Sequence, residues 1–236
     1  MRAVLLSLVA GCAAASADRP AAVGAPVVVE LFTSQGCSSC PPADKLLSSF
    51  ARDGSVRGRA VVPLAFHVDY WNELGWADPY SSPAWTARQQ GYARSLGDRS
   101  VYTPELVVAG GTGMVGSQAG RVADAIAAAP VQRELAATAT WSPRSLAVDA
   151  TAPGDAELWV AVWEDAPATA VARGENAGAM LVTDRVVRAL AKVAAPGQAG
   201  HVVVALEASW KPSGGVLFAQ RGDGHIVGAR VLPQGR

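Results

Sequence analysis

Residues 27–42 read VVVELFTSQGCSSCPP, and this segment sets the architecture of the first half of the chain. A valine-rich apolar run, typical of a buried strand, leads into a polar turn. Two cysteines separated by two serines come next, and the prolines after Cys40 are typical of a helix start. This order predicts an α/β fold in which Cys37 and Cys40 follow the carboxyl end of a strand, where ligands usually bind.

The spacing of Cys37 and Cys40 is compatible with three kinds of chemistry. Two thiols with two residues between them can close a disulfide ring and open it again, because they stay side by side. The pair can also be an inert structural disulfide, or it can supply two ligands to copper or zinc. The β-α-β pattern around it favours redox chemistry. The chain has no histidine-rich or methionine-rich tract, so no metal or other cofactor is expected.

The composition narrows the remaining classes of function. The chain has 236 residues, half of them hydrophobic, which is enough for one large domain or two small ones. Its 20 basic and 20 acidic side chains give a formal net charge of zero. Binding to nucleic acid or to an anionic membrane would need a basic patch, so neither is expected. The expected partner is a protein or a small thiol or disulfide.

The first 17 residues have the pattern of an export signal. A positive charge and a short apolar run over residues 4–10 precede Ala15–Ala17, which resembles a cleavage site, so the mature chain would begin at Asp18. Alternatively, cleavage before Cys12 at a lipobox-like sequence would leave a lipid anchor there. A cytosolic chain with an apolar start is the third interpretation. We expect a periplasmic or secreted protein, with a lipoprotein as the alternative, and no transmembrane span.

Export would leave Cys37 and Cys40 as the cysteine pair of the mature protein. Cys12 would either leave with the signal peptide or carry the lipid. An even pair of cysteines in an oxidising compartment predicts a disulfide between them as the resting state.

The rest of the chain divides into two parts with different hydrophobic patterns. Up to about residue 130, the hydrophobic periodicity predicts alternating helices and strands. The expected elements are helix 42–50, strand 61–66, helix 83–96, strand 105–109, a hairpin to strand 114–116, and helix 117–129. Beyond that point, short alternating runs predict an antiparallel, sandwich-like β region. Its expected strands are 145–151, 157–163, 201–207, 216–220 and 226–232.

A second group of candidate residues follows the predicted strand 61–66. The carboxyl ends of neighbouring parallel strands meet at one edge of a sheet, so His67 and Asp69 should lie near the cysteine pair. They would point to the same face if the strand continued through them. An imidazole and a carboxylate there could move protons during disulfide exchange, which predicts a catalytic role for both. Alternatively, His67 binds a loop and Asp69 caps a turn.

The order of the predicted elements resembles the thioredoxin fold. In that fold a loop with a cis-proline packs against the cysteine pair and presents its backbone to an extended substrate. The resemblance implies that Thr103 and Pro104 bind substrate opposite the cysteines; an ordinary trans proline at a strand entry is the alternative. The resemblance also implies that Cys37 is the attacking thiol and Cys40 the resolving one.

Pro41 and Pro42 depart from the usual pattern of such sites. Each proline disfavours helical geometry in the residue before it, so the helix is expected to start only at one of them. Cys37 would then lie farther from the positive end of the helix dipole, which lowers the pKa of a thiol. The reactivity of Cys37 therefore stays open at this point.

Two pairs of tryptophans and one glycine-flanked loop are further features of the sequence. Trp71 and Trp76 lie in an aromatic loop after His67 and are candidates for a substrate-facing wall. Trp159 and Trp163 have an even spacing on one predicted strand, so both should face the core. The glycine-flanked loop at residues 173–178 is either a structural turn or a segment that leans on the redox edge and binds a partner.

Several motifs are similar to those of a bacterial secreted family, the domain-of-unknown-function family 1223. They cover most of the mature chain: ELFTSQGCSSCPPAD at 30–44, FHVDYW at 66–71, Gly75–Trp76, Tyr102–Pro104 and GENAG at 174–178. The resemblance implies a thioredoxin-like fold and no particular activity.

Together these features predict an exported, thioredoxin-like protein that carries out thiol–disulfide exchange. One alternative is a binding module with a structural disulfide, and another is a copper- or zinc-handling protein that uses Cys37, Cys40 and His67. The predicted organisation is a signal peptide at residues 1–17, a thioredoxin-like domain at 18–130 and a mainly antiparallel β domain at 131–236.

Overall fold

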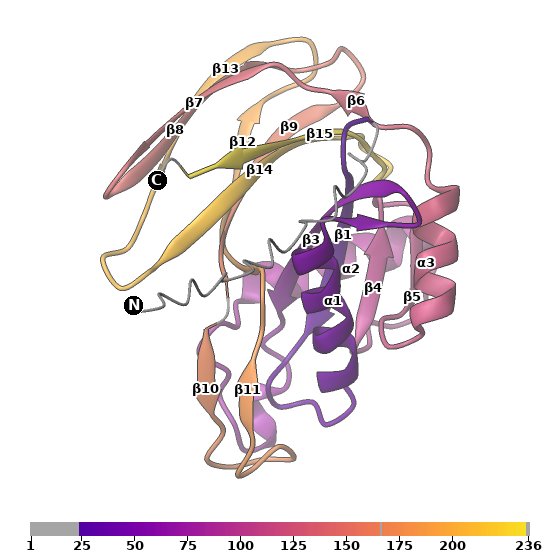
Figure 1. The fold of residues 1–236 in the computed structure, drawn as a ribbon, viewed down its shortest axis with the longest axis vertical. Coiled ribbons are helices and arrows are strands. Elements are labelled where there is room, and N and C mark those ends of the chain that lie inside the picture. The colour runs from indigo at the N-terminus through magenta and orange to yellow at the C-terminus, as the bar shows by residue number, and fades with distance from the viewer. Residues whose placement is uncertain (1–23, 166, 235–236) are drawn as a thin grey trace, which may run out of the picture.

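The computed structural model describes residues 24–165 and 167–234, which form a mixed α/β protein with one large sheet (Figure 1). The predicted signal peptide and Cys12 lie outside these residues. The sheet has ten strands, in the order β5-β4-β1-β3-β12-β9-β14-β15-β6, with β2 paired on β3. The helices are α1 (Pro41–Asp53), η1 (Asn72–Leu74), α2 (Pro83–Leu96) and α3 (Ala119–Ala128). Within the described residues, no helix is long and apolar enough to cross a membrane.

The first strands of the chain form one end of the large sheet. β1 (Val27–Thr33) pairs in parallel with β3 (Arg59–His67), and β2 (Ser55–Val56) folds back on β3. On its other side, β1 pairs antiparallel with β4 (Glu105–Val108), which continues through a hairpin into β5 (Thr112–Val115). All seven residues of β1 are buried, as its continuous apolar run predicts for a strand covered on both faces.

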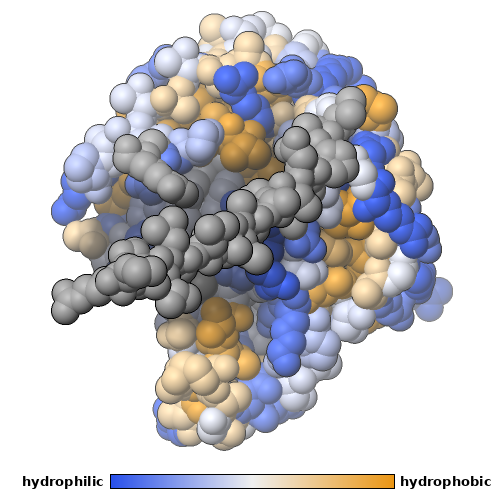
Figure 2. Space-filling model, viewed as in Figure 1, coloured by the Kyte–Doolittle hydropathy of each residue, from blue (hydrophilic) through white to orange (hydrophobic). Residues whose placement is uncertain are grey.

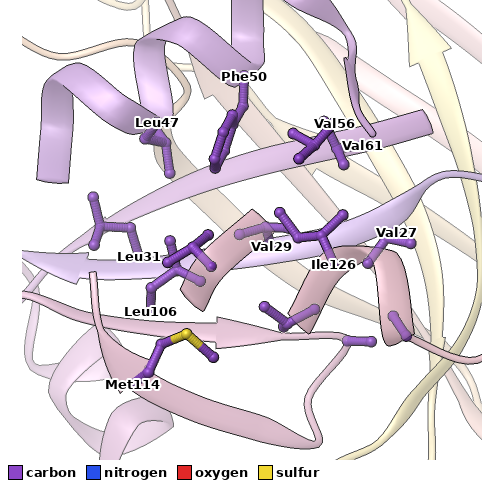
Figure 3. Close-up of a cluster of buried hydrophobic side chains, with 14 of the residues drawn as sticks. Val27, Val29, Leu31, Leu47, Phe50, Val56, Val61, Leu106, Met114 and Ile126 are labelled. Atoms are coloured by element: carbon purple, nitrogen blue, oxygen red, sulfur yellow. The ribbon is translucent and has the colours of Figure 1, made fainter. Parts of the chain in front are cut away.

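Alternate side chains of β1 enter two different cores. Val29 and Leu31 pack with Leu47 and Phe50 of α1 and with Ile126 of α3 (Figure 3). The side chains between them, Val28 and Phe32, face the opposite way and pack under α2. The period of two along a strand thus places helices on both faces of this end of the sheet.

The second half of the chain extends the same sheet. Its strands there are β6 (Arg133–Glu134), β9 (Glu157–Glu164), β12 (Val186–Ala194), β14 (Pro212–Gln220) and β15 (Ile226–Pro233). A second sheet of three strands consists of β7 (Ala137–Ser142), β8 (Ser145–Thr151) and β13 (Ala199–Ala205). A cluster that includes Leu146, Val160 and Leu217 fills the space between the two sheets. The arrangement is sandwich-like, as the alternating sequence pattern predicts.

The predicted boundary near residue 130 falls between α3 and β6. β3 pairs with β12 across this boundary, so strands from both parts share one sheet. The division into two domains stays a prediction.

A two-stranded hairpin projects from the body of the protein (Figure 1). It consists of β10 (Ala168–Ala170), β11 (Met180–Val182) and the loop between them, and we call residues 168–182 the arm. Met180 is 65% exposed and Val182 50% exposed. Figure 2 shows apolar surface at this end of the molecule.

Candidate functional site

The cysteine pair lies in a short loop between β1 and α1. Residues 34–40, which we call the dithiol loop, turn the chain through backbone hydrogen bonds from the Cys37 N–H to Ser34 and from the Cys40 N–H to Cys37. Cys37 and Cys40 form a disulfide, with Cα atoms 5.5 Å apart, which confirms the predicted pairing. Neither cysteine has exposed surface. The disulfide is therefore covered by the surrounding structure.

The helix begins where the two prolines predict. Pro41 is the first residue of α1, and Cys40 is its N-cap residue. The N–H groups of Ala43 and Asp44 donate to the Cys40 carbonyl oxygen. Cys37 precedes the N-cap by three residues and lies outside the helix, so the helix dipole acts more directly on Cys40.

Thr103 and Pro104 lie beside the dithiol loop, and the peptide bond between them is cis. The Ser39 hydroxyl lies 3.3 Å from the Cys37 sulfur and 3.5 Å from the Thr103 carbonyl oxygen, to which it donates. Gln89 of α2 supports this segment by donating to the Tyr102 carbonyl oxygen at 2.7 Å. The cysteine pair and the Thr-Pro segment, 63 residues or more apart in sequence, are thus neighbours in space.

The two tryptophans of the aromatic loop contact the same neighbourhood, and both are partly buried. The Trp71 indole N–H donates to the Thr103 hydroxyl at 2.8 Å, and the Trp76 indole N–H donates to the Gln35 side-chain oxygen at 3.1 Å. Gly36 leaves room for Trp71, since a Cβ at Gly36 would lie 3.1 Å from the Trp71 Cβ. The structure therefore brings Trp71 and Trp76 next to the dithiol loop.

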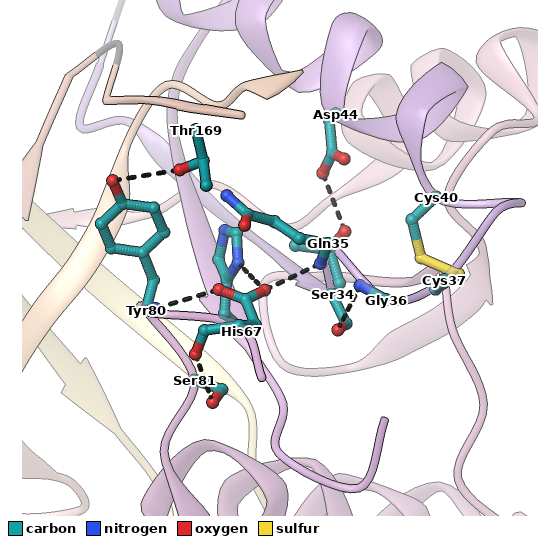
Figure 4. Close-up of polar contacts among 12 residues, drawn as sticks. Ser34, Gln35, Gly36, Cys37, Cys40, Asp44, His67, Tyr80, Ser81 and Thr169 are labelled. Atoms are coloured by element: carbon teal, nitrogen blue, oxygen red, sulfur yellow. Dashed lines mark hydrogen bonds and ion pairs between the residues drawn. A yellow bond between two sulfur atoms is a disulfide. The ribbon is translucent and has the colours of Figure 1, made fainter. Parts of the chain in front are cut away.

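His67 forms a buried ion pair with Asp78, a residue that the sequence did not indicate. The His67 Nδ1 and Asp78 Oδ2 atoms are 2.7 Å apart, and the same oxygen accepts from the Gln35 N–H at 2.7 Å (Figure 4). The Tyr80 N–H donates to the other Asp78 oxygen. Asp78 thus connects His67 to the dithiol loop.

For each member of this pair, burial and ion pairing shift the pKa in opposite directions. Burial alone would lower the pKa of His67, but the charge and hydrogen bond of Asp78 outweigh it and raise that pKa. Burial would raise the pKa of Asp78, but His67 and the backbone N–H groups of Gln35 and Tyr80 lower it. The pairing therefore favours the charged form of both groups.

Asp69 has a different partner from the one that its spacing to His67 suggests. β3 ends at His67, so the strand does not continue through Asp69. The Asp69 carboxylate accepts from the Thr86 hydroxyl of α2, and its backbone N–H donates to the same hydroxyl oxygen. The structure therefore places Asp69 against α2, and Asp78 takes the position beside His67. A catalytic role for His67 and Asp69 stays a prediction.

Asp44 is a second acid at the site that was not among the predicted site residues. It lies one turn along α1 from Cys40, and both residues are buried at the start of the helix (Figure 4). Its carboxylate accepts from the Thr33 hydroxyl at 2.9 Å. Burial raises the pKa of Asp44 to about 6, against smaller opposing effects of His67 and Thr33. The spacing of four residues after Cys40 is the signal that could have identified it.

Replacing Asp44 with asparagine should increase the free energy of unfolding at neutral pH by about 1–3 kcal/mol. The unfolded carboxyl ionises near pH 3.8 and the folded one near pH 6, so the wild-type protein loses stability as the pH rises through this window. Urea denaturation at acid and neutral pH measures the difference, which should vanish below about pH 4. Asp124→Asn, on the exposed face of α3, is the control and should change stability by less than about 1 kcal/mol. Equal stability of Asp44→Asn and wild type at neutral pH would contradict the raised pKa.

The arm contacts the dithiol loop through the loop at residues 171–179. Asn176 donates from its side-chain nitrogen to the carbonyl oxygens of Gln35 at 2.9 Å and Cys37 at 3.0 Å. Glu175 accepts from the Ser38 N–H at 3.0 Å. The sequence allowed two interpretations of residues 173–178, a structural turn or a loop that binds a partner at the redox edge. In the structure this segment contacts the dithiol loop, at the edge of the sheet that carries the cysteines.

The described residues contain no cluster of three or more His, Cys, Asp and Glu side chains that could hold a metal ion. His67 is paired with Asp78, and both sulfur atoms are in the disulfide.

The fold and the site define a mixed α/β protein with a buried disulfide at a strand-to-helix junction. The model of the family described as "Protein of unknown function (DUF1223)" matches residues 28–220. The chain belongs to this family, as the resemblance of its motifs predicts.

The solved structures that are similar to this chain include two that cover most of it. One is the crystal structure of protein AGR_C_4864 from Agrobacterium tumefaciens, which is 31% identical with a TM-score of 0.71; the match covers 91% of this chain and 96% of that one. The other is HBP35 of Porphyromonas gingivalis, at 14% identity and a TM-score of 0.60, over 89% and 75% of the two chains. The second likeness concerns the fold alone. No curated protein matched the chain.

Proposed function

We propose that this protein is an exported, thioredoxin-like protein that exchanges disulfides with a protein or a small thiol through Cys37 and Cys40. The observation that carries the proposal is Asp44, a buried carboxyl one turn from Cys40 whose pKa lies near 6. Its ionisation costs stability at neutral pH, and an inert disulfide has no need of such a group. Perturbed carboxyls of this kind are typical of sites that transfer protons.

Asp44 and the cysteines have complementary roles in the proposed reaction. The Cys37 thiolate attacks one sulfur of a substrate disulfide, and the other substrate sulfur leaves and takes up a proton. Asp44 accepts the proton of Cys40, and the Cys40 thiolate attacks the Cys37 sulfur in the mixed disulfide. The second substrate thiol is released. The proton that Cys37 lost to solvent on forming its thiolate balances the one taken up by the first substrate sulfur, and Asp44 passes the Cys40 proton to the second. In total two electrons and two protons pass from the cysteine pair to the substrate, and a substrate dithiol reverses the sequence.

The neighbouring residues support a role in binding an extended substrate. Thr103, Pro104 and Trp71 lie along one side of the dithiol loop, and Trp76 contacts Gln35 within it. The order of β1, α1, β3, α2, β4, β5 and α3 supports a thioredoxin-like assignment for residues up to about 130. We propose that the backbone near Thr103 pairs with substrate, and that the tryptophans form the adjacent wall.

A second candidate function rests on a specific observation, the burial of both cysteines. A covered disulfide resists exchange, so the protein could instead be a binding module in which this bond is structural. Exchange requires the groups around Cys37, including Ser39 and the arm, to move aside.

The test combines two measurements on the full chain. The first is the reduction potential of the Cys37–Cys40 pair, and the second is capture of mixed disulfides by the Cys40→Ser variant. The proposed function predicts a potential above about −300 mV and a trapped adduct on Cys37 that a reductant releases. The Cys37→Ser, Cys40→Ser double variant is the control and should trap nothing. A potential below about −300 mV with no adduct would favour the structural disulfide.

A further inference from the structure

One charged side chain of the arm reaches the dithiol loop. The Glu175 Oε2 atom accepts the Ser38 N–H at 3.0 Å, across 137 residues of sequence. Ser38 directly follows Cys37, so this carboxylate lies one peptide unit from the residue that carries the attacking sulfur. Glu175 is exposed, whereas Cys37 has no exposed surface. The proposed exchange reaction does not use this carboxylate.

The residues on either side of Glu175 fix its position. Asn176 donates to the Gln35 and Cys37 carbonyl oxygens. Gly174 has a φ of +81°, and a Cβ at this position would lie 3.1 Å from the Cβ of Trp76. The left-handed backbone and the close approach to Trp76 both favour glycine here. The carboxylate is therefore held by the fold beside the cysteine pair.

We propose that Glu175 is a positioning residue that sets the redox poise of the Cys37–Cys40 pair, by disfavouring the Cys37 thiolate and thereby favouring the disulfide. The inference rests on the proposed function in one respect, namely that Cys37 is the attacking thiol. A residue of the β-rich second half of the chain would thus influence the redox chemistry of the cysteine pair in the first half.

Two physical effects act in the same direction. A backbone N–H next to a cysteine is a hydrogen-bond donor that can stabilise its thiolate, and Glu175 already occupies the N–H of Ser38. The negative charge of Glu175 also repels a second negative charge nearby. The hydrogen bonds from Ser38 lower the pKa of Glu175, so the carboxylate is charged at neutral pH. Reduction of the disulfide creates the thiolate that Glu175 opposes.

Other charged groups lie on the segments around the dithiol loop: Asp44, Lys45, His67, Glu73, Asp78 and Arg173. Asp44, His67 and Asp78 are buried, and the last two neutralise each other as an ion pair. Lys45, Glu73 and Arg173 are exposed. All six stay unchanged when Glu175 is replaced, so the comparison isolates the effect of its charge.

The first measurement is the pKa of the Cys37 thiol in the Cys40→Ser variant, from the ultraviolet absorbance of the thiolate. Glu175→Gln keeps a hydrogen-bond acceptor and removes the charge, and it should lower this pKa by about half a unit to one unit. Glu175→Lys should lower it further, because it reverses the charge. An equal pKa in all three proteins, or an order that does not follow the charge, would overturn the inference.

The second measurement is the equilibrium of the complete cysteine pair with a reference dithiol. At about pH 9, where thiols ionise, Glu175→Gln should shift this equilibrium toward the reduced protein by up to tenfold, or about 30 mV. At about pH 5 both thiols are protonated and the difference should disappear. Glu134→Gln, on β6 at the far edge of the sheet, removes the same charge and should change neither quantity.

These readouts are independent of any substrate protein. If Cys40→Ser traps no adduct but Glu175→Gln still shifts the thiol pKa, the proposed exchange activity fails and the effect of Glu175 stands. If Cys40→Ser traps adducts both with and without Glu175→Gln, while the thiol pKa and the equilibrium stay unchanged, the inference about Glu175 fails and the proposed function stands.

Discussion

Replacing Arg88 with methionine should destabilise the protein by about 3–5 kcal/mol, because it leaves a buried carboxylate without its counter-charge. Arg88 of α2 donates to Glu30 of β1 from two nitrogens, at 3.0 and 2.7 Å. Glu30 has no exposed surface, and the Arg88 side chain is 11% exposed. Arg88 also donates to Gln220 of β14 and to the Tyr92 hydroxyl, and so joins three elements from both parts of the chain.

Urea denaturation followed by circular dichroism measures this loss. Lys192→Met removes one partner of the exposed Lys192–Glu157 pair and serves as the matched control, with an expected change of less than about 1 kcal/mol. Adding Glu30→Met to Arg88→Met should recover much of the loss, because no buried charge is then left unpaired. A loss below about 1 kcal/mol for Arg88→Met would show that the ion pair contributes little.

Replacing Asp78 with asparagine should cost about 3–5 kcal/mol of unfolding free energy at about pH 5–6 and loosen the dithiol loop. The substitution removes the charge that faces His67. It also removes one of the carboxylate oxygens that accept from His67, Gln35 and Tyr80. A buried donor then loses its partner, which adds to the loss of the ion pair.

The pH dependence gives this prediction a distinctive signature. Asp78 has a lowered pKa when folded, so its contribution is present above its unfolded pKa of 3.8 and lost as the pH falls through the folded value. His67 has a raised pKa, so its contribution is present below its unfolded pKa of 6.5 and lost as the pH rises through the folded value. The difference between wild type and Asp78→Asn should therefore be largest between about pH 4 and pH 6.5.

Asp69→Asn is the matched control for Asp78→Asn. The asparagine oxygen at position 69 can still accept from the Thr86 hydroxyl, and the site is only partly buried. Its expected cost is below about 1 kcal/mol. If Asp69→Asn removed more stability than Asp78→Asn, the assignment of Asp78 as the partner of His67 would be wrong.

The local pattern of the sequence predicts most elements of the first half of the chain. The buried run at Val27 ends at Thr33, helix 83–96 has the predicted bounds, and Pro41 starts the first helix. These features depend on periodicity and on proline chemistry, which act over a few residues. In the second half, β8 spans the predicted residues 145–151, and β9, β13, β14 and β15 overlap their predictions.

The strand that joins the two halves of the sheet does not follow from the sequence pattern. β12 reads VVRALAKVA, in which charged residues interrupt the apolar alternation, and its pairing with β9 shifts register twice. Such irregularities obscure the period of two on which strand prediction depends. The short strands β2, β6, β10 and β11 have two or three residues each, too few for a periodic signal.

The candidate site was predictable where it depends on strand ends, and not where it depends on distant pairing. Cys37 follows β1, His67 is the last residue of β3 and Thr103 precedes β4, all at one edge of the sheet, so their proximity follows from topology. Asp78 and Glu175 reach the site from irregular segments. Their contacts with Gln35 and Ser38 span 43 and 137 residues, and no spacing rule in a single sequence predicts such contacts.

The cysteine pair and the arm that contacts it are synthesised at different times. Because Ser38 precedes Glu175 by 137 residues, a ribosome completes the dithiol loop long before it synthesises the residues that cover it. β12, which extends the sheet next to β3, is also synthesised later than β1, α1 and β3. Both cysteines are therefore part of the nascent chain before the arm that contacts them has been synthesised. The cysteine pair and the residues that shield it are thus separated in the order of synthesis.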